Sequence, residues 1–326
     1  MRTDRILVAG ETLVDLFPDG AGSLAAVDGF RHRPGGAPAN VAAGLAEYGD
    51  PPAFWTRLGG DAFGEFLAGV LADRGLDGEF VVRGDDPTAL AVVAPTASGD
   101  RSFTFYAADT ATLAFDTGTV PDAALGEVDA VHVGGVALAD ARGRAATLDL
   151  AERAAEAGRL VSVDPNYRPA LWGDSDAAVD ALRDLLAHAD LACCSADDLA
   201  PLGLAADARR DPEAAARDLL ASGPDTVFLT RGGDGATAVT EATASGDPVA
   251  VSRPAYDVDA VDATGAGDAF CAAVLAHLEP GAGLETESLR GVLDAACAAG
   301  ALATTERGGV SALPSAAAVE RLRVST

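Results

Sequence analysis

Short apolar runs alternate with amphipathic stretches along most of the chain. The apolar runs have the length of buried strands, and they lie at 6–9, 53–58, 129–133, 160–164, 189–194 and 226–230. Apolar residues at helical spacing predict helices at 41–48, 64–74, 141–157, 176–187 and 212–221. From residue 129 onward the two kinds of segment alternate, and this βα rhythm predicts a parallel sheet covered by helices on both faces.

Two parts of the chain depart from this rhythm. Residues 90–95 and 101–106 alternate apolar with polar or small residues around the sequence TASGD, which predicts a hairpin. Because a hairpin does not fit a doubly wound sheet, we expect it to belong to a small β lid. Near the end of the chain, strand-like segments at 236–240 and 249–253 precede two long helices at 266–278 and 287–304. No linker or repeat divides the sequence, so we expect one domain over residues 1–326.

The charge of the chain is strongly acidic. It carries 50 acidic and 23 basic residues, a net charge of -27, and every basic residue is arginine. An acidic excess without lysine is typical of a halophilic source, where carboxylates keep the surface solvated and salt screens their repulsion. A GC-rich genome that turns lysine codons into arginine codons is the alternative. We predict a loss of stability at low salt. The acidity also argues against nucleic-acid binding, because no basic stripe could contact phosphates.

The cysteines and the N-terminus indicate a cytoplasmic protein. Cys193, Cys194, Cys271 and Cys297 form no CxxC pair, so we expect them to be small buried side chains in a reducing compartment. The apolar part of the N-terminus is too short for a signal peptide. No stretch of 18 uncharged apolar residues predicts a membrane span.

Residues 262–270, DATGAGDAF, form a turn that leads into a helical pattern. Gly265, Ala266 and Gly267 have almost no side chains, so their N–H groups can surround an anion at the helix start. Asp268 beside them could accept a proton from an attacking hydroxyl while the N–H groups stabilise a phosphoryl group. The alternative is that Asp268 only complements the helix dipole.

Three other positions are candidates for ligand contacts. Gly35 and Gly36 allow close approach of the backbone, and Asn40 follows at a helix start with an amide suited to a sugar hydroxyl. Asp15 follows the first strand, where open α/β sheets bind ligands. Thr230 begins a glycine-rich turn that suits a flat or phosphorylated ligand, although a hairpin turn would look the same. The sequence has neither a Walker A pattern nor GxGxxG at the first strand.

The segments GGAPAN and DATGAGD resemble the two signature motifs of the ribokinase/PfkB family of ATP-dependent sugar kinases. Matches such as GETLVDL, LGGDAFGEFL, TALAVVAPTASGDRSFTFY, DPNYRPALW and LTRGGDGA extend the resemblance over nearly the whole chain. It implies a ribokinase-like doubly wound α/β fold with a small β lid from parts of 11–34 and 88–108. It also implies that ATP and Mg²⁺ are used to phosphorylate a primary hydroxyl of a sugar.

The resemblance assigns roles by position. It implies Asp268 as the base, with Gly265, Ala266 and Gly267 as the anion hole. The implied sugar contacts are Asp15, Gly35, Gly36, Asn40, Phe105, Tyr106 and Arg168. The implied nucleotide contacts are Ser195, Thr230, Gly232, Gly235 and Cys297. A K⁺ site is implied at Asp262, Thr264, Ala303 and Gly308.

The sequence departs from the family pattern in two places. Many members carry Asn-x-x-Glu to order water around Mg²⁺, where this chain has Ser195 and Asp198, a carboxylate one methylene shorter. Cys297 stands where many fructokinases have asparagine near adenine, so a hydrogen bond is expected to be absent there.

The identity of the sugar depends on Arg168 and on the lid. An arginine at this place suits fructose or the carboxylate of 2-keto-3-deoxygluconate. Kinases of that acid usually have Tyr-Tyr-Arg in the lid, where this chain has Phe105, Tyr106 and Ala107, and losing one carboxylate partner costs on the order of 1.5–3 kcal/mol. We therefore expect fructose, with 2-keto-3-deoxygluconate or ribose as alternatives. A sugar- or nucleotide-binding sensor without catalysis is the alternative of another class. Pairing of lids into a homodimer is a further expectation.

Overall fold

The computed structural model describes residues 2–20, 27–95, 101–243, 246–279 and 284–325. Its main feature is a nine-stranded sheet in the order β13-β12-β11-β10-β9-β8-β1-β4-β5. The strands are β1 (Ile6–Ala9), β4 (Ala53–Leu58), β5 (Val81–Arg83), β8 (Ala130–Gly134), β9 (Leu160–Asp164), β10 (Leu191–Ser195), β11 (Thr226–Thr230), β12 (Ala236–Thr240) and β13 (Val249–Arg253). All neighbours pair in parallel except β11–β12 and β12–β13, which pair antiparallel. The predicted fold class is confirmed.

The order of the strands reverses beside β1. From β1 the chain builds outward through β4 and β5, and it then returns to β8 on the other side of β1. Open α/β sheets bind ligands at the carboxyl ends of their strands at such a switch point. The strands β1, β8, β9 and β10 therefore deliver the residues that follow them to one edge of the sheet.

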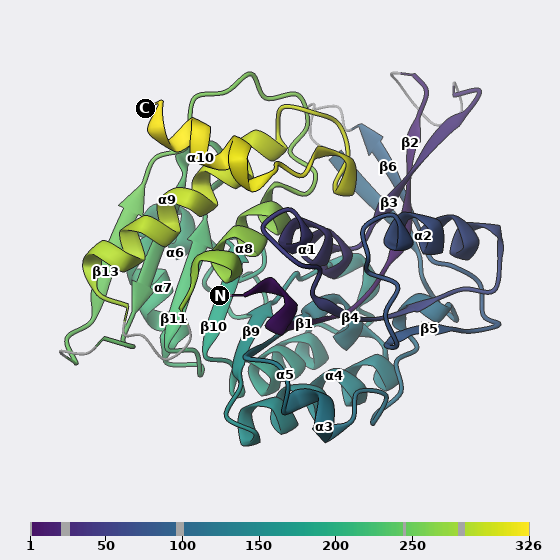
Figure 1. The fold of residues 1–326 in the computed structure, drawn as a ribbon, viewed down its shortest axis with the longest axis horizontal. Helices are drawn as coiled ribbons and strands as arrows, with labels where there is room; N and C mark the ends of the chain where they lie inside the picture. Colours follow the sequence, from purple (N-terminus) through teal and green to yellow (C-terminus); the bar gives the residue numbers. More distant parts are fainter. Residues whose placement is uncertain (1, 21–26, 96–100, 244–245, 280–283, 326) are drawn as a thin grey trace.

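Helices cover both faces of the sheet (Figure 1). One face carries α1 (Ala37–Ala46), α2 (Ala62–Ala72), α8 (Ala266–His277), α9 (Thr286–Ala303) and α10 (Ala316–Val324). The other carries α3 (Asp122–Leu125), α4 (Ala141–Glu156), α5 (Ser175–Leu186), α6 (Ala205–Arg210) and α7 (Pro212–Leu220). Successive side chains of β1 alternate between the two cores, because strand residues point to opposite faces in turn: Ile6 and Val8 lie in one core, Leu7 and Ala9 in the other.

A separate four-stranded sheet has the order β3-β2-β6-β7. Its strands are β2 (Leu13–Pro18), β3 (Phe30–Gly35), β6 (Leu90–Pro95) and β7 (Arg101–Tyr106). β6 and β7 form the predicted hairpin, whose TASGD turn lies outside the described residues. Asp61 ties this sheet to the main domain: it caps α2 by accepting from Gly64 N at 2.8 Å and also accepts from Thr88 N at 2.8 Å, just before β6.

The elements differ from the sequence prediction mainly at the N-terminus of α1. We predicted a helix over 41–48, but it begins at Ala37, because a proline in the first helical turn needs no hydrogen bond there. Asn40 therefore lies inside the helix. β5 and α6 were not predicted, and neither was α10, which Ser315 caps by accepting from Ala318 N at 3.3 Å.

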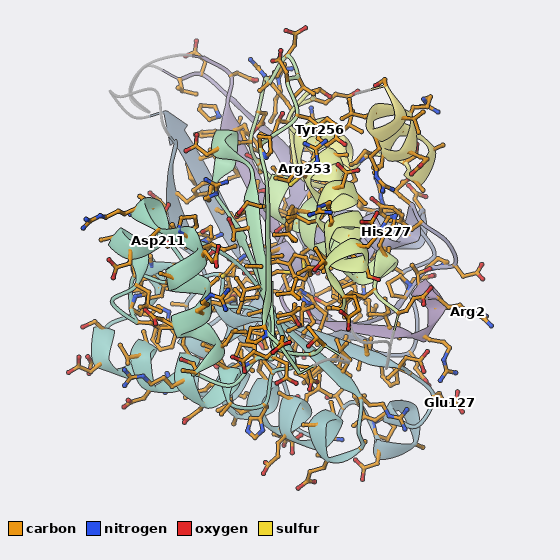
Figure 2. The ribbon with its side chains drawn as sticks, turned by 90° about the vertical axis from the view of Figure 1, so that its left-hand side faces the viewer. Arg2, Glu127, Asp211, Arg253, Tyr256 and His277 are labelled. Atoms are coloured by element: carbon orange, nitrogen blue, oxygen red, sulfur yellow. The ribbon has the colours of Figure 1, made fainter. Side chains whose placement is uncertain are left out.

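Polar contacts join the C-terminal helices to the edge of the sheet. The guanidinium of Arg253 lies 3.8 Å from the centre of the Tyr256 ring, and both side chains donate to Asp294 of α9 (Figure 2). Arg323 of α10 donates to the other oxygen of Asp294 at 2.9 Å. One half-buried acid thus holds β13, α9 and α10 together.

The four cysteines are free and buried, as predicted. Among the described residues, none of the helices has the length and apolar character that crossing a bilayer requires.

Candidate active site

The N-termini of α1 and α8 meet at the carboxyl edge of the main sheet. The two helices pack closely, because a Cβ atom on Gly44 of α1 would lie only 2.8 Å from the Cβ of Ala272 of α8. This approach places Asn40 against Asp268. Asn40 Nδ2 donates to Asp268 Oδ2 at 2.5 Å. The two signature segments therefore meet through one hydrogen bond, which we did not predict.

The surroundings of Asp268 set its proton affinity. Burial raises the pKa of Asp268 to about 6, and the nearby charge of Asp198 also raises it. The hydrogen bond from Asn40 and the charge of Arg168 act in the opposite direction and lower the pKa. The carboxyl group is therefore mostly ionised at neutral pH and able to accept a proton. A base whose pKa lies near the working pH transfers protons efficiently.

The turn before α8 exposes backbone N–H groups. Gly265 has φ 80°, and a Cβ atom there would lie 2.8 Å from Gly309 Cα, so only glycine fits. Ala266 N already donates to Ala263 O at 3.2 Å. In the described part of the chain, the N–H groups of Gly265 and Gly267 have no acceptor. These two groups are the better candidates for holding an anion.

Asp15, Gly35 and Gly36 lie together at the base of the small sheet. A Cβ atom on Gly35 would lie 2.4 Å from Asp15 Oδ2, so the carboxylate rests against this glycine. Gly36 has φ 106°, and its Cβ atom would lie 2.4 Å from the carbonyl oxygen of Glu11. Asn40 N donates to Gly36 O at 3.0 Å, which links this loop to the start of α1.

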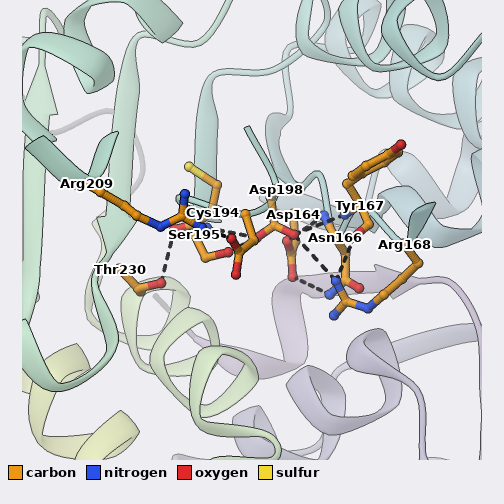
Figure 3. Close-up of polar contacts among 10 residues, drawn as sticks. Asp164, Asn166, Tyr167, Arg168, Cys194, Ser195, Asp198, Arg209 and Thr230 are labelled. Atoms are coloured by element: carbon orange, nitrogen blue, oxygen red, sulfur yellow. Dashed lines mark hydrogen bonds and ion pairs between the residues drawn. The ribbon is translucent and has the colours of Figure 1, made fainter. Parts of the chain in front are cut away.

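Two acidic side chains, Asp164 and Asp198, lie beside Arg168 at the ends of β9 and β10 (Figure 3). Asp198 accepts from Tyr167 N at 3.0 Å, from Ser195 N at 2.8 Å and from Ser195 Oγ at 2.6 Å. Arg168 Nη1 lies 3.5 Å from Asp198 Oδ1. Asp164 accepts from Asn166 N and Nδ2, both at 3.0 Å. Asp198 thus joins the two loops that follow neighbouring strands.

Negative charge at this edge exceeds what Arg168 can balance. Burial and the neighbouring Asp198 raise the pKa of Asp164, against the lowering by Asn166. A divalent cation arriving with a nucleotide would relieve this repulsion, and carboxylate oxygens are ligands that Mg²⁺ accepts. No group of three or more histidine, cysteine or acidic residues in the described part is arranged to hold a metal by itself. These residues fit a Mg²⁺ ion that is held mainly by phosphates and water.

The predicted nucleotide residues lie along β10, β11 and α9. Thr230 ends β11 and donates from Oγ1 to Cys194 O at 3.2 Å. Gly232 and Gly235 have φ 56° and 90° in the turn from β11 to β12. These values fit a hairpin turn as well as a turn that binds a ligand. Cys297 is buried, and burial raises the pKa of its thiol to about 12, so it stays neutral.

The predicted cation residues come from two neighbouring segments, the loop before α8 and the end of α9 with the loop after it. Asp262 accepts from Thr264 N at 2.8 Å and from Gly308 N at 3.2 Å. Asp262 N donates to Thr304 O at 3.0 Å, next to Ala303. The structure thus gathers the residues that the resemblance implied, with a buried carboxylate at their centre.

The two aromatic lid residues are placed differently from each other. Phe105 packs against the apolar cluster that contains Leu13, Ala91 and Val136. Tyr106 is 62% exposed, so the structure does not enclose it in the site.

Comparison with known proteins identifies the family. Residues 3–316 match the sequence model of the pfkB family carbohydrate kinase. The chain belongs to the pfkB family of carbohydrate kinases. It is 34% identical over 327 residues to a probable fructokinase-5 from Arabidopsis thaliana, an alignment that covers 99% of this chain and 98% of that protein.

Solved structures of two fructokinases share the fold over nearly the whole chain. A fructokinase from Xylella fastidiosa with bound ATP superposes with a TM-score of 0.85 at 31% identity, covering 99% of both chains. A double mutant of the fructokinase from Vibrio cholerae O395, bound to fructose, ADP and potassium ion, has a TM-score of 0.84 at 28% identity and covers 98% of both chains.

Glu11 is a site residue of this pfkB kinase that sequence reasoning missed. It is 2% exposed, and its Oε1 accepts from Ala37 N at 3.2 Å at the start of α1. Its Oε2 is buried without a hydrogen-bond partner among the described residues. Burial raises the pKa of Glu11 to about 8, so this acid is mostly protonated at neutral pH. An acidic residue directly after a buried strand was the available signal, but we considered only Asp15 in that segment.

Proposed function

We propose that this pfkB kinase transfers the γ-phosphoryl group of ATP to a primary hydroxyl of fructose. The observation that carries the proposal is the hydrogen-bonded pair of Asn40 and Asp268 beside the N-terminus of α8. A carboxylate that can accept a proton next to free N–H groups is suited to phosphoryl transfer, which depends on positioning and on stabilising charge.

The chain's own residues would carry the reaction as follows. Asp15, the Gly35–Gly36 loop and Asn40 hold the sugar, and Asn40 orients Asp268. Asp268 accepts the hydroxyl proton as the sugar oxygen bonds to the γ-phosphorus and the bond to the ADP oxygen breaks. The N–H groups of Gly265 and Gly267, with the α8 dipole, stabilise the charge on the phosphoryl oxygens.

Two cations would assist the nucleotide. Mg²⁺ would neutralise charge on the phosphates, held through water by Asp198 near Asp164. Asp262, Thr264, Ala303 and Gly308 would hold K⁺, and the Vibrio cholerae fructokinase bound to potassium ion supports this role. Thr230, Gly232, Gly235 and Cys297 would line the nucleotide site.

Fructose is the proposed sugar for two reasons. Proteins that align with the chain over nearly its whole length include a probable fructokinase from Arabidopsis thaliana and the fructokinase from Xylella fastidiosa. Ala107 stands where kinases of 2-keto-3-deoxygluconate usually have arginine. It is 7% exposed. Arg168 then remains as the cation that could bind the carboxylate of that acid. Its Nη1 atom already lies 3.5 Å from Oδ1 of Asp198, so its charge is partly balanced.

Turnover with fructose tests this proposal against a binding-only sensor. Incubation of the protein with ATP, Mg²⁺, K⁺ and fructose should release ADP and form a fructose phosphate in equal amounts. ADP release has to depend on the sugar, which a no-sugar reaction controls. Binding of fructose and ATP without any phosphorylated product would contradict the proposal and favour the sensor.

We also propose that the protein works in a salt-rich cytoplasm, with the edge strands of the small sheet available for pairing in a homodimer. The support is the net charge of -27 without lysine and the position of β3 and β7 at the edges of the small sheet in the described part of the chain. Melting temperature should fall when molar KCl is replaced by low salt, because self-repulsion is then unscreened. An unchanged melting temperature would contradict this part. The particle mass in molar KCl tests the dimer.

A further inference from the structure

Basic side chains line a groove between β3 and α2, two elements that lie side by side in Figure 1. The groove has a volume of about 590 Å³, within the usual range for small-molecule sites. Its lining consists of Phe30, Arg31, His32, Arg33, Pro34, Phe66, Val70, Arg74 and Ser311. Three of these nine residues are arginines and none is acidic, in a chain with 50 acidic and 23 basic residues. We name it the Arg33 groove.

Two of the three guanidinium groups carry charge that no carboxylate balances. Arg33 is half-buried, and its guanidinium forms neither an ion pair nor a hydrogen bond with any residue that the structure describes. Arg74 donates to the carbonyl oxygens of Val70 and Val310, both at 3.4 Å, which leaves its charge unneutralised. In a protein with this net charge, two uncompensated cations in one hollow indicate a site for an anion.

Asp19 and Glu65 each already have an ion-pair partner. Asp19 pairs with Arg31 at 2.7 Å, and Glu65 pairs with Arg83 outside the groove at 3.3 Å. Asp15 lies opposite Arg33 in the register of β2 and β3, but its carboxylate rests against Gly35.

The walls of the groove add apolar surface to the charge. Phe30 is 44% exposed, and the Phe66 ring meets His32 edge to face with 4.7 Å between ring centres. Guanidinium groups bind phosphate oxygens in a fixed fork geometry, and aromatic rings favour a flat apolar body. We propose that the Arg33 groove binds a phosphate monoester that carries an apolar ring.

The groove is separate from the catalytic pair but adjoins it. Pro34 leads directly into the Gly35–Gly36 loop. The Cδ atom of Arg33 lies 3.8 Å from the position of a Cβ atom on Gly308, and a Cβ atom on the neighbouring Gly309 would lie 2.7 Å from the amide of Asn40. A ligand in the groove would therefore contact the strand that ends at the sugar loop.

Calorimetric titration with phenyl phosphate and with inorganic phosphate tests this proposal. The enzyme is first saturated with a non-hydrolysable ATP analogue, so that the phosphate positions of the catalytic centre are filled. Wild type should bind phenyl phosphate more tightly than inorganic phosphate. Arg33→Gln should weaken phenyl phosphate binding by at least about tenfold, because a charge-assisted hydrogen bond is lost. Its melting temperature should stay nearly unchanged, because the Arg33 guanidinium forms no ion pair or hydrogen bond with the described residues.

Arg83→Gln is the matched control, because Arg83 is ion-paired and lies outside the lining. It should bind phenyl phosphate like wild type. Absence of binding to wild type, or equal binding by wild type and Arg33→Gln, would overturn the proposal. If wild type bound phenyl phosphate and inorganic phosphate with equal affinity, the proposal that the ligand carries an apolar ring would be wrong.

Discussion

Replacing Asp268 by asparagine should lower kcat for fructose phosphorylation by about 10²–10⁴-fold, because the amide cannot accept the hydroxyl proton. The neutral isostere leaves the packing of α8 unchanged, so the dissociation constant of fructose should stay near the wild-type value. Steady-state ADP release and a sugar titration measure the two quantities. Asp218→Asn, an exposed acid on α7, is the control and should keep full activity.

The pH dependence of kcat/KM is a second test of Asp268 as the base. Burial raises the pKa of Asp268 to about 6, and the group must be ionised to accept a proton. Wild-type kcat/KM should therefore fall about tenfold per pH unit below that value. The residual activity of Asp268→Asn should lack this acidic limb. Near wild-type turnover by Asp268→Asn would remove Asp268 from the mechanism.

Replacing Gly36 by alanine should raise KM for fructose at least about tenfold while changing KM for ATP little. At φ 106° an L side chain is strained, at a cost of about 1–3 kcal/mol, and its Cβ atom would lie 2.4 Å from the backbone oxygen of Glu11. The loop must move to accommodate it, and Asp15 and Asn40 move with it. Separate KM measurements for the two substrates check this result.

Gly69→Ala is the matched control for Gly36→Ala. Gly69 lies on the exposed side of α2, and a Cβ atom there has no neighbour within 4 Å. This change should leave both KM values unaltered and stabilise the helix by about 0.5–1 kcal/mol. An unchanged KM for fructose in Gly36→Ala would show that the loop does not hold the sugar.

The main sheet could be predicted because its strands are short apolar runs set between amphipathic helices. The strands β11 and β12 have the predicted bounds of 226–230 and 236–240. β3 could not be recognised as a strand, since Phe30–Gly35 has no apolar run and its first three residues are exposed at the edge of the sheet. β5 has only three residues, too few for a periodic signal.

The candidate residues of the site could be predicted from motif chemistry, but their contacts could not. The bond between Asn40 and Asp268 depends on how closely α1 and α8 pack at Gly44, which no local pattern encodes. The raised pKa of Glu11 likewise depends on burial by elements distant in sequence. Ala266 was assigned to the anion hole, but its N–H group is engaged by Ala263 within the turn itself.

A competition assay tests the central claim most directly. Fructose, 2-keto-3-deoxygluconate and ribose are mixed in equal amounts with limiting ATP, and the phosphorylated products are identified by nuclear magnetic resonance. The ratio of products equals the ratio of kcat/KM values. We predict fructose phosphate as the main product. A majority of phosphorylated 2-keto-3-deoxygluconate or ribose would contradict the assignment of fructose.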